Sequence, residues 1–82
     1  MPSAEDLLQE LETHAARHSG ARVSRILTIL DGLGWRIREG KGSHKVATSP
    51  LGRNITIPTG SRVVPRYCVQ QLLKEAKRCG GV

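Results

Sequence analysis

Residues 34–45 are Gly-Trp-Arg-Ile-Arg-Glu-Gly-Lys-Gly-Ser-His-Lys, and the fold that we predict for the chain is centred on them. Apolar and charged residues alternate from Trp35 to Glu39, which is typical of a half-buried strand. Gly40-Lys41-Gly42 then predicts a turn, and His44 opens a second strand. The stretch therefore predicts a short hairpin that carries basic side chains and one histidine.

The elements around this hairpin follow from the spacing of apolar residues. Two helices are predicted before it, over residues 3–18 and 22–33, each with an apolar face. A third strand over residues 53–57, a loop over residues 59–64 and a helix beginning at Pro65 are predicted after it. The predicted fold class is α+β: an α-β-β-β-α domain with a three-stranded antiparallel sheet packed on helices, plus an extra N-terminal helix.

Strand alternation also predicts which side chains face the helices. We expect the inward set to be Trp35, Ile37, Val46, Ile55 and Ile57. We expect the outward set to be Arg36, Arg38, Lys45 and Arg53. Like charges on neighbouring strands repel one another, so this face favours a polyanion ligand. A charged face that only contacts solvent is the alternative.

Charge is divided unevenly along the chain, which has 13 Lys and Arg residues against 7 Asp and Glu residues. Residues 1–20 hold four carboxylates and one arginine, a net charge of −3, and residues 21–82 hold twelve basic and three acidic residues, a net charge of +9. A body this basic is typical of proteins that bind nucleic acid. We therefore predict an acidic helical extension over residues 1–20 and a basic domain over residues 21–82.

The acidic N-terminal helix allows two arrangements. It folds across the basic sheet and competes with RNA, or it packs through its leucine stripe as an additional core helix. Its His14 and His18 have the i, i+4 spacing of a metal-binding pair, but no third ligand lies nearby in the sequence. We therefore favour an exposed helix surface there, and predict neither a metal nor another cofactor.

Targeting signals are not evident. The first residues are acidic rather than basic, and no apolar run approaches the length of a membrane span. Cys68 and Cys79 fall on one predicted helix, about 16 Å apart at 1.5 Å per residue, which is too far for a disulfide. These features indicate a cytoplasmic protein with reduced thiols and no membrane contact.

Four short motifs occur in a fixed order along the chain. They are Gly34-Trp35, Gly42-Ser43-His44, Ile55-Thr56-Ile57-Pro58 and Val69-Gln70-Gln71-Leu72-Leu73-Lys74-Glu75-Ala76. With these motifs, residues 22 to about 79 resemble the HicA family of toxin ribonucleases, whose α-β-β-β-α fold is similar to the double-stranded-RNA-binding domain. The family commonly has a second histidine after the third strand, where this chain has Thr59-Gly60-Ser61.

The resemblance implies a toxin of a type II toxin-antitoxin system. Such a protein cleaves mRNA without a metal ion, uses the Gly-Ser-His histidine as its essential residue, and is neutralised by a HicB-like antitoxin protein. On this chain the histidine is His44.

The residues themselves are suited to this chemistry. An ordinary imidazole titrates near about pH 6.5, so His44 is predicted to act as general base or general acid in attack by the RNA 2′-hydroxyl. The predicted RNA-binding residues are Arg36, Arg38, Lys41, Gly42, Ser43, Lys45 and Arg53. The second proton-transfer group is left open among a lysine, Tyr67, water and no group at all.

A different function remains open from the sequence alone. A histidine at the start of a strand is often held by a loop carbonyl and takes part in no chemistry. The chain would then be a non-catalytic RNA-binding module of the same fold, with His44 at most touching a phosphate.

Overall fold

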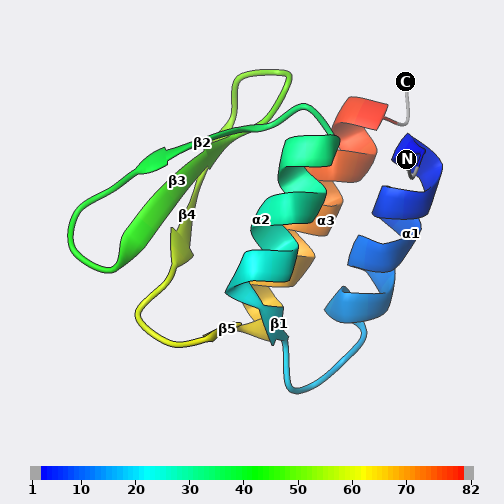
Figure 1. The fold of residues 1–82 in the computed structure, drawn as a ribbon. Coiled ribbons are helices and arrows are strands. Elements are labelled where there is room, and N and C mark those ends of the chain that lie inside the picture. The colour runs from blue at the N-terminus through cyan, green and yellow to red at the C-terminus, as the bar shows by residue number, and fades with distance from the viewer. Residues whose placement is uncertain (1–2, 81–82) are drawn as a thin grey trace.

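A computed structural model describes residues 3–80 of the chain (Figure 1). Its elements in chain order are α1 (Ala4–Ala15), β1 (Ala21–Arg22), α2 (Val23–Gly32), β2 (Arg36–Glu39), β3 (His44–Thr48), β4 (Asn54–Pro58), β5 (Val63–Val64) and α3 (Arg66–Gly80). Strands β2, β3 and β4 form an antiparallel sheet in that order. The predicted α+β class, with α-β-β-β-α after an extra N-terminal helix, is confirmed.

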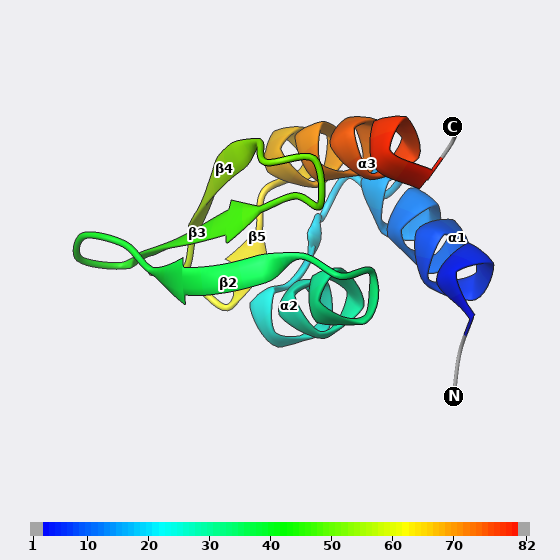
Figure 2. The same ribbon diagram turned by 90° about the horizontal axis from the view of Figure 1, so that it is seen from above.

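The molecule is layered, with α2 and α3 in the middle. Seen from above, the three-stranded sheet lies on one side of these two helices and α1 lies on the other side (Figure 2). Helix α1 contacts both α3 and α2. The arrangement in which the acidic helix folds across the basic sheet is therefore wrong, and the additional core helix is the one observed.

A local signal sets the start of α1, and a tertiary contact is made at its end. Its predicted capping box is present: the Asp6 N–H donates to the Ser3 hydroxyl at 3.2 Å, and the Ser3 N–H donates to the Asp6 carboxylate at 3.4 Å. The helix ends at Ala15, three residues before the predicted end. The Ala15 carbonyl accepts from the Arg66 side chain at 3.2 Å, so a tertiary contact replaces the bond of a further helical turn.

Strands β1 and β5 form a two-residue antiparallel pair that the sequence did not predict, since residues 59–64 were assigned to a loop. We call this pair the clip. It joins the segment before α2 to the segment before α3, so both helices begin side by side and run in the same direction (Figure 1). The clip requires Gly20, whose φ is +76° and whose added Cβ would lie 2.1 Å from the Val64 carbonyl oxygen.

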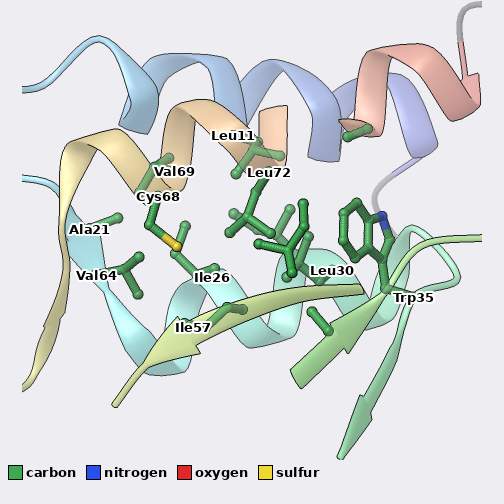
Figure 3. Packing of buried hydrophobic residues seen from close by; sticks show 14 of the residues in the cluster. Leu11, Ala21, Ile26, Leu30, Trp35, Ile57, Val64, Cys68, Val69 and Leu72 are labelled. Atoms are coloured by element: carbon green, nitrogen blue, oxygen red, sulfur yellow. The ribbon is translucent and has the colours of Figure 1, made fainter. Parts of the chain in front are cut away.

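One hydrophobic core holds the layers together (Figure 3). It draws Leu7 and Leu11 from α1, Ile26, Ile29 and Leu30 from α2, Val69 and Leu72 from α3, and Ile55 and Ile57 from the sheet. Trp35 is 4% exposed and packs with them, as its strand parity predicted. The core therefore includes the acidic helix as well as the basic domain.

The predicted inward face of β3 is wrong by one residue. Ala47 is buried and pairs with Ile37 on one side and Ile55 on the other, so these three residues face the helices. Val46 is only half-buried, and its partners are Arg38 and Thr56 on the outer face. In this register, the small side chain of Ala47 lies between those of Ile37 and Ile55 on the inner face.

A buried carboxylate of α3 forms a hydrogen bond with the β3–β4 turn. Glu75 is 2% exposed, and it accepts from the Ser49 hydroxyl at 2.7 Å and from two Arg78 nitrogens at 2.8 and 2.7 Å. The Arg78 guanidinium, together with Ser49, lowers the pKa of Glu75 to about 2. Ser49 also accepts from the Arg53 N–H at 3.1 Å, which closes the turn.

Cys68 and Cys79 are both free thiols, as their positions on one helix predicted. Burial of Cys68 raises the pKa of its thiol. Within residues 3–80, no helix is long and apolar enough to cross a membrane.

Candidate nucleic-acid interface

The outer face of the sheet carries three rows of cross-strand neighbours. Arg36, Thr48 and Asn54 form the first row, and Arg38, Val46 and Thr56 form the second. His44 lies in the third row, opposite Pro58. Rows on one face of a sheet are about 7 Å apart, so both arginines lie within a few side-chain lengths of the histidine. The helices pack on the other face, so this surface is open (Figure 2).

His44 is exposed at the point where the hairpin enters β3. Its carbonyl accepts from the Gly40 N–H at 2.9 Å, which closes the hairpin. Its ring Nδ1 lies 3.2 Å from the Lys41 carbonyl oxygen, which can only accept, so Nδ1 carries the hydrogen. In the neutral ring the lone pair is therefore on Nε2, and no other group of residues 3–80 binds that atom.

The tip of the hairpin projects beyond the helices (Figure 1). Lys41, Gly42 and Ser43 are all exposed there, and Gly42 has a φ of +59°. The N–H groups of Gly42 and Ser43 have no acceptor among the described residues, so they remain free donors for an anion. The segment after β4 supports the tip, because the Thr59 N–H donates to the Ser43 carbonyl at 2.6 Å.

Arg36 and Arg38 are exposed and form no ion pair with a carboxylate of residues 3–80. They border a shallow groove of about 750 Å³ that also includes Thr48, Asn54 and Asp31. Thr48 and Asn54, which are joined by a hydrogen bond of 2.7 Å, were not predicted to belong to this face. The alternation of β3 and β4 places both residues beside Arg36, but only when the register of the strands is known.

Two predicted interface residues do not face outward as expected. Lys45 pairs with Ile57 in the register, so it shares the inner face, where its ammonium forms an ion pair with Glu39. Arg53 lies on the helix side, with its guanidinium 4.0 Å from the Glu75 carboxylate. The outward orientation predicted for both residues is wrong. For Lys45 the cause is the incorrect face assignment of β3. For Arg53 the cause is the buried Glu75 carboxylate, which the sequence did not predict.

Three other residues considered from the sequence lie away from this face or apart from one another. His14 contacts Glu10, whereas His18 lies beyond the end of α1 and accepts from Arg66 at 3.0 Å, so the two histidines do not form a pair. The described residues contain no group of three His, Cys, Asp or Glu side chains arranged to hold a metal ion. Tyr67 is 64% exposed in the first turn of α3.

Comparisons of the chain with protein-family models, with curated proteins and with solved structures each found no match. The HicA resemblance stays a prediction. The functional evidence is therefore the geometry of the outer face, which carries His44, Arg36 and Arg38.

Proposed function

We propose that this chain is an endoribonuclease that cleaves mRNA without a metal ion, with His44 as the general base. One observation carries the proposal. An exposed histidine, held by a backbone carbonyl through Nδ1, shares a sheet face with two unpaired arginines. A metal-independent ribonuclease needs a base with a free lone pair and fixed positive charge beside the scissile phosphate.

The reaction that fits this site uses the 2′-hydroxyl of the RNA as nucleophile. Nε2 of His44 takes the hydroxyl proton, and the 2′-oxygen forms a bond to phosphorus. The bond from phosphorus to the 5′-oxygen breaks, and solvent protonates the leaving oxygen. Arg36, Arg38 and the free N–H groups of Gly42 and Ser43 stabilise the charge on the phosphorane. The products are a 2′,3′-cyclic phosphate and a 5′-hydroxyl.

A non-catalytic RNA-binding module is the second candidate. The contact between Nδ1 and the Lys41 carbonyl favours it, because a purely structural histidine makes the same bond. In that case the arginines and the hairpin tip bind the RNA backbone, and His44 does no proton transfer.

The substitution His44→Ala separates the two candidates. With the purified proteins in excess chelator, we expect the wild type to cut single-stranded RNA and the variant to lose at least about 100-fold in rate, the usual contribution of a general base. RNA affinity should change less than about threefold, because the arginines remain. Analysis of the cleaved ends should find the cyclic phosphate.

His18→Ala is the matched control, since it removes an exposed histidine that lies between α1 and β1, outside the three-stranded sheet. It should cleave as the wild type does. If the wild type leaves RNA intact, or if His44→Ala cuts as fast as His18→Ala, the nuclease proposal fails and the binding module stands.

The toxin role and its partner follow from the HicA resemblance. We propose that the protein acts in the cytoplasm, where mRNA is available, and that a HicB-like antitoxin covers the outer face. Induced expression of the wild type should then stop growth, and expression of His44→Ala should not.

A further inference from the structure

Strand β2 forms a free edge of the three-stranded sheet. In the order β2-β3-β4, its other side pairs with no strand of residues 3–80. Figure 2 shows the hairpin end of β2 clear of the helices. The opposite edge, β4, is protected, because the Thr56 carbonyl accepts from the Cys68 thiol of α3 at 3.8 Å and Pro58 has no N–H to offer. The edge that is left open to a further strand is therefore β2.

The hydrogen bonds of the hairpin fix which backbone groups of β2 point to this edge. The Gly40 N–H donates to the His44 carbonyl at 2.9 Å, so these two residues form a hydrogen-bonded pair. Such pairs alternate along an antiparallel ladder, so Arg38 also bonds to β3. The N–H and C=O groups of Ile37 and Glu39 therefore point away from β3, and the backbone bonds outside the ladder use neither residue.

The side chains of β2 favour a strand in which acidic and apolar residues alternate. Arg36 and Arg38 on the outer face are exposed and pair with no carboxylate of residues 3–80. Residues opposite them on an added strand face the same way, so carboxylates there form ion pairs across the edge. On the inner face, Ile37 is half-buried at the end of the row that continues through Ala47 and Ile55. An apolar residue opposite Ile37 extends that row.

A second copy of this chain does not suit the edge. Self-pairing must use Ile37 and Glu39, whose backbone groups point outward. With Ile37 opposite Ile37, Arg36 lies opposite Arg38. With Ile37 opposite Glu39, the two copies of Arg38 lie opposite each other, and with Glu39 opposite Glu39 two carboxylates meet. Like charges directly opposite destabilise a strand pair, so each register opposes self-association.

An RNA backbone satisfies half of the edge. Phosphate oxygens accept from the N–H groups of Ile37 and Glu39, but phosphates offer no donor to the carbonyls of the same residues. An extended polypeptide supplies a donor and an acceptor at every second residue, so it pairs with the whole edge. The backbone therefore favours a protein segment, and the arginines favour an acidic one.

We propose that β2 binds an extended protein segment in which acidic and apolar residues alternate, and that this segment adds to the sheet antiparallel to β2. Main-chain hydrogen bonds give such a contact its affinity, and alternate side chains give it specificity. Because Arg36 and Arg38 are also proposed to bind RNA, the segment and RNA exclude each other. This exclusion rests on the proposed function, whereas the strand addition does not.

The test uses the full-length wild type and a synthetic peptide, Glu-Val-Glu-Val-Glu-Val-Glu, with blocked ends. Backbone amide NMR shifts are followed during titration, and we expect saturable shifts at Ile37 and Glu39. N-methylation of the valines removes the N–H groups that face β2 and should weaken binding at least about tenfold. N-methylation of the glutamates is the matched control, because their N–H groups point to solvent, and it should leave binding nearly unchanged.

Charge is tested on both partners. A peptide with lysine in place of every glutamate should not bind. Arg36→Ala/Arg38→Ala should weaken binding of the acidic peptide at least about tenfold through the loss of two charge-assisted contacts. Arg17→Ala/Lys74→Ala removes the same charge from exposed positions outside the sheet and should bind as the wild type does.

Strand addition is overturned if the edge amides do not move, or if both N-methylated peptides bind as the parent does. Loss of binding with the methylated glutamates alone overturns the antiparallel arrangement, and equal binding of the lysine peptide overturns the acidic partner.

Other occupants of the edge give different results. Shifts of the Ile37 and Glu39 amides with protein concentration alone assign the edge to a second copy. If the peptide fails and single-stranded RNA moves these amides in the His44→Ala variant, the edge belongs to nucleic acid. Either result overturns the proposal, and none of these measurements depends on RNA cleavage.

Discussion

The environment of His44 is local, whereas that of Glu75 depends on tertiary contacts. The carbonyl that fixes the His44 ring is three residues away, so the hairpin sequence was enough to predict an exposed histidine at a turn. Glu75 and Arg78 have the spacing of an ordinary surface pair on a helix. The burial of Glu75 against Ser49 depends on a contact across 26 residues, which no local pattern encodes.

The buried carboxylate makes stability depend on pH. Because the folded pKa of Glu75 is about 2 and its ordinary value is 4.5, its contribution is present above pH 4.5 and is lost as the pH falls towards 2. Glu75→Gln should therefore lower the thermal unfolding midpoint at neutral pH, and the difference from the wild type should shrink across that interval. Thermal unfolding at a series of pH values measures it.

Glu12→Gln is the matched control, because Glu12 is exposed and its ion pair with Lys77 is long, at 4.0 Å, and therefore weak. The thermal unfolding midpoint of this control variant should be close to that of the wild type at every pH. If the midpoints of Glu75→Gln and the wild type differ as much at pH 2.5 as at pH 7, the ionisation of Glu75 does not cause the pH dependence of stability.

At the level of the elements, long periodic segments were predictable and short ones were not. The helices and the three longer strands follow from apolar spacing, with no end displaced by more than three residues and both ends of β3 as predicted. The clip strands have two residues each and thus carry no periodicity. The alternation of β3 is misleading, because Ala47 is less apolar than its neighbour Val46, and the pairing with the partner strands sets which of them faces the helices.

The clip is expected to be sensitive at Gly20. Gly20→Ala combines a positive φ with a collision against the Val64 carbonyl, so we expect it to lower the free energy of unfolding by at least about 2 kcal/mol. Gly52→Ala isolates the first effect, since its φ is +93° and its Cβ would enter open space. It should cost about 1 kcal/mol. Denaturant unfolding measures both, and equal losses would show that the clip tolerates the added methyl.

At the scale of the whole molecule, the division of charge was evident in the sequence but its arrangement was not. A net charge of −3 over residues 1–20 allowed a helix that covers the basic sheet, and the leucine stripe of the same residues allowed an additional core helix. The apolar stripe of α1 proved decisive, because burying Leu7 and Leu11 against α2 and α3 requires the helix to lie on the side away from the sheet. Residues 3–80 therefore leave the outer face uncovered.

This arrangement predicts which cations set the salt dependence of RNA binding. Each phosphate contact on a single strand contributes about 0.7 to the slope of log affinity against log salt. Arg36→Ala/Arg38→Ala should thus lower the slope by about 1.4. Lys45→Ala/Arg53→Ala removes the same charge from the inner face and should leave the slope nearly unchanged. Affinities measured over a range of salt concentrations compare the two, and equal decreases would contradict an outer-face interface.

The parallel course of α2 and α3 from the clip has an electrical consequence. The partial positive ends of both helices lie at the clip, and Arg17 and Arg22 border the first turn of α2 there, while Lys77 and Arg78 near the far end are paired with carboxylates. Antiparallel α1 places its acidic first turn at that far end too. The molecule thus has a permanent electric moment along its helix axes. The field of a polyanion exerts a torque on that moment, which acts together with the attraction of the outer-face arginines before any atoms touch.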